Sequence, residues 1–188
     1  MDKELVIYIM TLIGEVPHYV YEGLLSVFCI GAVSLLTWKG KKAWQGIAKL
    51  LLSEYAFLIY CSTVIFREVN PSRGHYFTPF WSYSRQDLIA ENVMNVVVFI
   101  PVGILLFLTQ KKRASQLKAW IIAIVSGFAM SVGIESLQLI FKKGYAEVDD
   151  LMHNTLGCFI GCTLCLLIAK TWSCSMNWCR LHWGKESC

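Results

Sequence analysis

Five long apolar stretches alternate with short polar connections along the chain. None of them carries more than one charged residue, and they are Gly23–Trp38, Leu50–Phe66, Asn92–Thr109, Ala119–Phe141 and Leu151–Ala169. Each approaches the ~20 residues that a helix needs to cross the hydrocarbon of a bilayer. The alternating pattern of membrane β-strands is absent. The pattern predicts an all-α, polytopic membrane bundle of about five transmembrane helices.

A shorter apolar run precedes the first long stretch. It spans only Leu5–Ile13 and is followed at once by Gly14, Glu15 and Pro17. Because it is too short to cross the bilayer, it predicts a short N-terminal helix that lies in the membrane interface.

Composition supports a membrane protein and narrows its class. The chain of 188 residues is 56% hydrophobic and only 16% charged, whereas soluble domains carry roughly 25% charged residues. So apolar a chain argues against a soluble enzyme and against a disordered segment. The net charge of +4 is explained by where the charges lie, so nucleic-acid binding is not expected.

The eight cysteines predict neither a disulfide framework nor a metal site. Five of them fall inside the apolar stretches, where cysteine packs as a small hydrophobic residue. The remaining three lie near the C-terminus and form no Cys-x-x-Cys pair of the kind found in zinc sites. No metal and no cofactor is therefore expected.

Basic residues are unevenly divided between the two sides of such a bundle. Eleven of the seventeen lysines and arginines lie in the connections after the first and third stretches and after the fifth. The positive-inside rule places these connections in the cytoplasm. We therefore expect a multi-pass protein of the cell membrane with its N-terminus outside and its C-terminus cytoplasmic.

Polar side chains recur on single faces of three predicted helices. Glu91 precedes Asn95 by four residues, Glu135 precedes Gln138 by three, and Asp150 precedes Asn154 by four, spacings that put side chains on one helix face. All lie near the outer ends, and Glu135 is about 9 Å deep at 1.5 Å per residue. Since ionisable groups inside spans usually serve a function, we predict an outward-facing polar pocket. Its predicted residues are Arg67, Asn92, Asn95, Glu135, Gln138, Asp149, Asp150 and Asn154.

Alternative roles remain open for several of these residues. The amides can act only as hydrogen bonds between helices, and the paired aspartates at 149 and 150 can cap the fifth helix. For Glu135 we expect either an ion pair with Arg67 or a protonated carboxyl bonded to Asn95 or Asn154. Gly157 and Gly161 have the small-residue spacing of close helix packing. The packed helices can belong to the same chain or to two copies in a homo-oligomer.

The longest outer connection, Arg67–Ala90, combines turn residues with five aromatic residues. Aromatic side chains at this density are typical of the headgroup level of a membrane. We expect the connection to lie on the membrane as a cap over the bundle.

Four motifs, in order, resemble those of the VanZ-like membrane proteins, over about Leu50 to Lys170. They are the aromatic loop Thr78–Tyr83, the span Glu91–Gly103 with Asn95 and Phe99-Ile-Pro101-Val-Gly103, the helix Ser131–Gln138 with Glu135, and the segment Glu147–Gly157 with Asp149-Asp150 and Asn154. Arg67 also sits where that family places an arginine. Lys142 and Lys143 stand where many members carry an arginine, so the charge is kept but bidentate anion binding is not.

The resemblance implies three regions: residues 1–49 with the first span and a basic loop, a VanZ-like membrane domain at 50–170, and a cytoplasmic tail at 171–188. The family's founding member is associated with low-level resistance to teicoplanin, a glycopeptide antibiotic.

The leading interpretation is a non-enzymatic envelope protein whose pocket binds an envelope lipid, a lipid-linked cell-wall precursor or a glycopeptide. The alternatives are an enzyme acting on a lipid-linked substrate, with Glu135 as its acid or base, and a small transporter.

Overall fold

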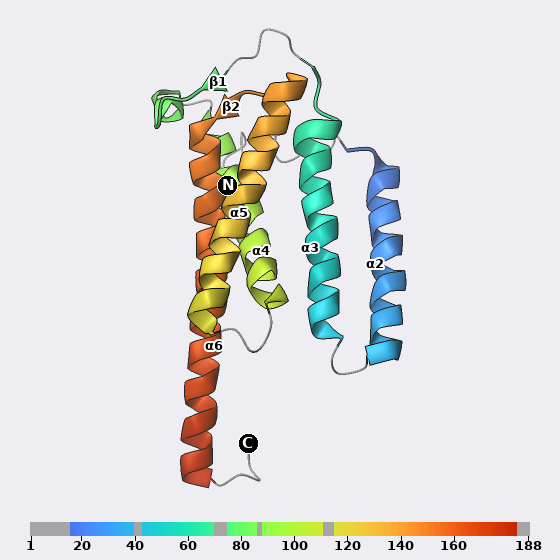
Figure 1. The fold of residues 1–188 in the computed structure, drawn as a ribbon, viewed down its shortest axis with the longest axis vertical. Coiled ribbons are helices and arrows are strands. Elements are labelled where there is room, and N and C mark those ends of the chain that lie inside the picture. Colours follow the sequence, from blue (N-terminus) through green and yellow to red (C-terminus); the bar gives the residue numbers. More distant parts are fainter. Residues whose placement is uncertain (1–15, 40–42, 70–74, 86–87, 111–114, 184–188) are drawn as a thin grey trace.

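The protein folds into a bundle of membrane-spanning helices (Figure 1). The computed structural model describes residues 16–39, 43–69, 75–85, 88–110 and 115–183. Its long helices are α2 (His18–Lys39), α3 (Trp44–Tyr60), α4 (Ile89–Thr109), α5 (Gln116–Phe141) and α6 (Val148–Trp183). Within these ranges, five helices are long and apolar enough to cross a membrane, which confirms the predicted all-α polytopic class. The predicted interfacial helix at Leu5–Ile13 lies outside the described residues.

Two helix boundaries differ most from the hydropathy pattern. Helix α3 begins at Trp44 and so includes Lys49, whose long side chain can reach the headgroup region from inside a helix. Helix α6 continues to Trp183, beyond the apolar span Val148–Thr171. The expected tail from residue 171 therefore begins as an extension of α6, which projects below the other helices in Figure 1.

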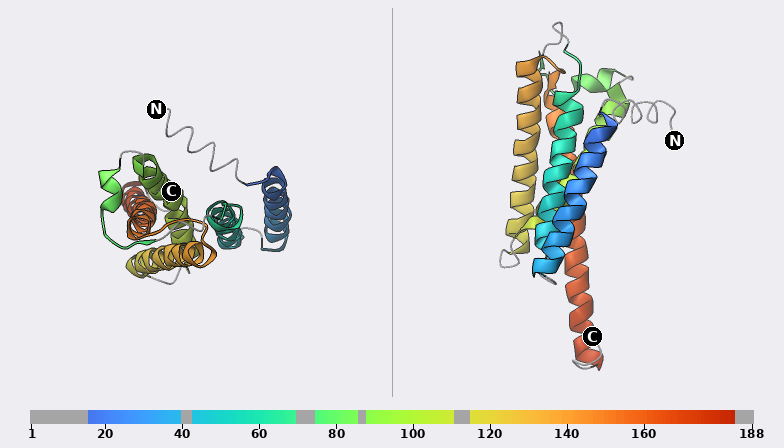
Figure 2. Two further views of the ribbon diagram at one scale, coloured as in Figure 1. Left: turned by 90° about the horizontal axis from the view of Figure 1, so that it is seen from above. Right: turned by 90° about the vertical axis from the view of Figure 1, so that its right-hand side faces the viewer.

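Helix α6 packs closely against α4, and α5 lies beside both helices (Figure 2). A Cβ atom at Gly157 or at Gly161 would overlap a backbone carbonyl of α4. The glycine spacing thus brings two helices of the same chain together, as small residues do in membranes. Helix α2 lies at the edge of the bundle beside α3, and none of its apolar window is buried.

Helix α3 ends in a single π-helical turn, η2 (Cys61–Ile65). The last carbonyl groups of a helix lack hydrogen-bond partners in their own helix. Here the donors come from one side chain of α5 and one side chain of the turn that follows α5. The Gln138 Nε2 donates to the carbonyl of Thr63 at 3.2 Å, and the Lys143 Nζ donates to that of Ile65 at 2.6 Å. These bonds hold the end of α3 against the end of α5.

The long connection between η2 and α4 forms a small aromatic cap over the same end of the bundle. Its strand β1 (His75–Tyr76) pairs in parallel with β2 (Ala146–Glu147), which leads directly into α6. Along the chain, β1 is followed by a 3-10 turn, η3 (Trp81–Ser84). The ring of Trp81 in this turn stacks on the ring of Tyr76 in β1, with centroids 3.9 Å apart. The cap thus ties the loop before α4 to the loop before α6.

Candidate functional site

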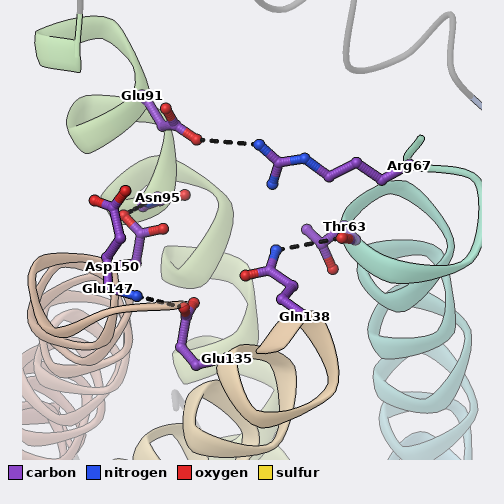
Figure 3. Close-up of polar contacts among 8 residues, drawn as sticks. All are labelled: Thr63, Arg67, Glu91, Asn95, Glu135, Gln138, Glu147 and Asp150. Carbon is purple, nitrogen blue, oxygen red and sulfur yellow. Dashed lines mark hydrogen bonds and ion pairs between the residues drawn. The ribbon is translucent and has the colours of Figure 1, made fainter. Parts of the chain in front are cut away.

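A cavity of about 100 Å³ lies at the capped end of the bundle, between α3–η2, α4, α5 and α6. Six of the predicted pocket residues line it: Arg67, Asn95, Glu135, Gln138, Asp150 and Asn154. They come from four segments that are distant in sequence and that meet around the cavity. Figure 3 shows five of the six, all except Asn154. Glu91 also lines the cavity, although it is not among the predicted pocket residues. Its position one helical turn before Asn95, on the same helix face, is the sequence signal for it.

The ion pair at this site differs from the predicted one. Arg67 faces Glu91 across the mouth of the cavity, with 3.7 Å between Nη2 and Oε1, and each side chain is about a quarter exposed. Glu135 instead accepts a hydrogen bond from the backbone N–H of Glu147 at 3.0 Å. The predicted Arg67–Glu135 pair is therefore wrong. Glu135 faces the β2 strand, whereas Arg67 extends from the end of η2 toward α4.

The structure also contains no hydrogen bond from Asn95 or Asn154 to Glu135, because the two amide groups donate elsewhere. That the Glu135 carboxyl is protonated stays a prediction. Asn95 donates to Asp150 Oδ1 at 2.7 Å, and Asn154 donates to Ser131 Oγ at 2.9 Å. With Gln138 bonded to Thr63, each of the three amide groups donates one N–H to a protein atom.

Two amide oxygens at the cavity are left without a partner. Among the described residues, no hydrogen-bond donor reaches Gln138 Oε1 or Asn154 Oδ1. Both side chains are buried, with 3% and 4% of their surface exposed. A buried acceptor without a partner costs ~1–3 kcal/mol, so a group supplied from outside the chain would satisfy these atoms.

A second cavity, of about 210 Å³, lies toward the aromatic cap and shares Arg67, Glu91 and Asp150 with the first. Tyr76, Trp81 and Glu147 also line it. Burial raises the pKa of Glu147 to about 7, and the negative charge of Glu91 adds to the shift. A carboxyl with this pKa is expected to change its charge near neutral pH, and it lies on the side of the site nearest the aromatic cap.

Asp149 and Asn92, by contrast, belong to a separate network that holds the cap in place. Asp149 is 1% exposed and accepts hydrogen bonds from Phe80 N, Ser82 N and Ser82 Oγ at 2.6, 2.9 and 2.6 Å. Asn92 donates to the same Ser82 hydroxyl at 3.1 Å. Phe80 has a φ of 64°, which is strained for an aromatic residue. We conclude that Asp149 anchors a strained turn and does not line the cavity.

The hydroxyl groups around the cavity are engaged in structural bonds. Ser62 and Thr63 donate to the carbonyl of Ile59 in their own helix, and Ser131 accepts from Asn154. None of these three is bonded to a carboxylate or a histidine in a way that would activate it. Within the part of the chain that the structure describes, no group of three or more His, Cys, Asp or Glu side chains is arranged to hold a metal ion.

Comparison with known proteins adds two matches to this geometry. A family model described as VanZ/LLP1 matches residues 25–169, a range that contains every residue of both cavities. Protein VanZ of Enterococcus faecium is 32% identical over 74 residues, which are 39% of this chain and 43% of that protein. The matched part thus spans less than half of the relative's length. No solved structure matches the chain.

Proposed function

The chain belongs to the VanZ/LLP1 family of multi-pass membrane proteins, and from this premise we propose that it is a binding protein of the cell envelope. Its polar cavity holds part of an envelope lipid, a lipid-linked cell-wall precursor or a glycopeptide. The observation that carries the proposal is the pair of buried amide oxygens without partners, Gln138 Oε1 and Asn154 Oδ1, at the cavity. Buried polar atoms in native proteins are nearly always satisfied, so a bound group would complete the site.

Binding is favoured over catalysis by the engaged hydroxyl groups. A hydroxyl nucleophile needs an adjacent base, whereas Ser62 and Thr63 donate to a helix carbonyl and Ser131 is held by Asn154. The carboxylates and the arginine at the cavity serve to recognise a polar group.

The membrane-facing surface offers room for the apolar part of such a ligand. An apolar groove of about 660 Å³ runs between α5 and α6 and is bordered by the exposed rings of Phe80 and Tyr83. Aromatic side chains of this kind are enriched at the headgroup level. A ligand with an acyl chain thus finds polar and apolar surfaces on one protein.

The orientation of the chain belongs to the same proposal. We propose an N-terminus outside and a C-terminus in the cytoplasm, which turns the cavity outward. Reporter fusions test this after Lys42, Tyr83, Lys112, Lys143 and Lys185. The reporters should lie alternately inside and outside, beginning inside. An external reporter after Lys112 would overturn the topology and move the cavity to the cytoplasmic side.

A binding screen on the detergent-purified protein tests the function. The probes are envelope phospholipids, lipid-linked wall precursors and teicoplanin, each measured for binding to the wild type and to variants. Glu135→Ala and Asn154→Ala should abolish binding, because both residues line the cavity. Glu54→Ala is the control, since Glu54 lies in α3 and lines neither cavity. Pocket variants that bind every probe as the wild type does would refute the proposal.

The family membership extends the proposal to antibiotic susceptibility. We expect the protein to give a low level of protection against teicoplanin when it is produced in a susceptible bacterium. The Glu135→Ala variant, made at the same level, should lose this protection, and Glu54→Ala should keep it. Equal protection by both variants would mean that the protection against teicoplanin does not depend on the cavity.

A further inference from the structure

The buried polar atoms that lack a partner at the cavity are hydrogen-bond acceptors. Asn95, Gln138 and Asn154 each donate one N–H to a protein acceptor, whereas the amide oxygens of Gln138 and Asn154 have no donor among the described residues. The oxygens of the lining carboxylates add further acceptors. We infer that the cavity selects a primary ammonium group, an inference that rests on the proposed binding function and names the chemistry of its ligand.

The charges around the cavity favour a cation. Three carboxylates line it, those of Glu91, Glu135 and Asp150, against the single guanidinium of Arg67. That guanidinium faces Glu91 at the mouth and is partly neutralised there. A phosphate or carboxylate in the cavity would meet like charges in a poorly solvated place, which disfavours binding. An ammonium group carries three N–H donors and no acceptor, which complements oxygens alone.

The volume limits how much of a ligand can enter. At about 100 Å³, the cavity is smaller than the ~150 Å³ cavity that holds one benzene molecule in another protein. A terminal ammonium on a two-carbon chain fits this space, whereas a sugar ring does not. A trimethylated ammonium has no N–H to donate and would leave the amide oxygens of Gln138 and Asn154 unpaired.

The second cavity lies beside the first, and a headgroup on its way to the inner acceptors would occupy it. The two cavities share Arg67, Glu91 and Asp150. The lining of the second carries two arginines, Arg67 and Arg85, against three acids, Glu91, Glu147 and Asp150. The stacked rings of Tyr76 and Trp81 border it, and aromatic faces attract ammonium groups. A headgroup presented from the membrane surface would pass these rings before its ammonium reached the inner acceptors.

Binding of three matched lipids to the purified protein tests the inference. The probes are short-chain phosphatidylethanolamine, phosphatidylcholine and phosphatidylglycerol, which differ in a primary ammonium, a quaternary ammonium and no amine. We expect phosphatidylethanolamine to bind about tenfold or more tightly than either of the others, the ratio that one charged hydrogen bond provides. Free ethanolamine is the fourth probe. If it binds like the lipid, a soluble amine suffices as ligand, and if it does not, the lipid is the source; both results support an ammonium site.

Two matched substitutions locate the binding. Asp150→Asn removes one charge but keeps an oxygen for the Asn95 donor, and we expect it to weaken phosphatidylethanolamine binding about tenfold. Glu54→Gln makes the same chemical change in α3 away from both cavities and should leave binding unchanged. A second pocket variant, Glu135→Gln, should behave as Asp150→Asn does.

The outcomes separate this inference from the proposed function. If phosphatidylglycerol or phosphatidylcholine binds as tightly as phosphatidylethanolamine and the pocket variants weaken it, the binding function stands and the ammonium inference is wrong. If no probe, wall precursor or glycopeptide responds to either pocket variant, both are wrong. An ammonium preference that persists unchanged in Asp150→Asn and Glu135→Gln would place the site elsewhere and refute the inference.

Discussion

The two adjacent aspartates at the start of α6 allow a sharp test of the structure. Asp149 and Asp150 are neighbours in sequence, yet the first anchors the aromatic cap and the second lines the cavity. We expect Asp149→Asn to destabilise the fold strongly and Asp150→Asn to leave it nearly intact. Each substitution replaces one carboxylate oxygen with an NH2 group of similar size, so volume is not changed.

The magnitude follows from the hydrogen bonds of the two side chains. Asp149 Oδ1 accepts from Phe80 N, and Oδ2 accepts from both Ser82 N and Ser82 Oγ. An amide keeps only one acceptor oxygen, so at least one backbone N–H would face another donor. Hydrogen bonds to charged groups contribute ~1.5–3 kcal/mol each, and losing one or two gives about 2–5 kcal/mol. Asp150→Asn still accepts from Asn95 and should cost about 1 kcal/mol or less.

Two measurements check this prediction. Thermal unfolding in a fixed detergent should show Asp149→Asn melting roughly 5–15 °C below the wild type, given ~2–4 °C per kcal/mol for a chain of this length. Limited proteolysis with chymotrypsin should also cleave more rapidly near Phe80, because the anchor no longer holds that strained turn. Mass spectrometry of the fragments identifies the cleavage site.

The reasoning is refuted if the two asparagine variants melt together and their caps are cleaved equally. Such a result would mean that the bonds from Phe80 and Ser82 to Asp149 add nothing to stability. A loss confined to Asp150→Asn would mean that the roles of the two residues are reversed.

Three further predictions follow from the same structure. Gly161→Leu should cost about 3 kcal/mol or more through overlap with α4, and thermal unfolding should show no comparable loss for Gly23→Leu, where the space is open. A double-mutant cycle with Arg67→Gln and Glu91→Gln should give a coupling of about 1 kcal/mol or less, since both side chains are about a quarter exposed; a larger value would contradict a loose pair. The pKa of Glu147 is raised from 4.5 to about 7, so the folded state holds its proton longer than the unfolded chain does, and stability should fall as pH rises between these values. Denaturation at several pH values should show that the free energy of unfolding falls less steeply with pH in Glu147→Gln than in the wild type. An unchanged dependence on pH would mean that other groups cause it.

Hydropathy alone determined which segments cross the membrane, because lipid offers no hydrogen bonds to the backbone and each span must be a long apolar helix. The depth of polar residues in those helices also identified most of the cavity. Asn95, Glu135 and Asn154 lie near the same end of the bundle, and depth can be counted along a helix. The Gly157–Gly161 spacing likewise predicted a close helix contact, since only a small side chain allows backbones to approach.

The tertiary structure decided which polar side chains bond to one another. Successive residues on a helix point about 100° apart, since a turn holds 3.6 residues, so Asp149 and Asp150 face different neighbours although depth and chemistry make them equivalent. Arg67 meets Glu91 because Glu91 faces it from the first turn of α4, whereas Glu135 faces the β2 strand. Which side chains face one another depends on packing between helices, which no count along one chain segment contains. For the same reason, only the folded bundle shows that the Gln138 amide donates to Thr63 and that its oxygen has no partner among the described residues.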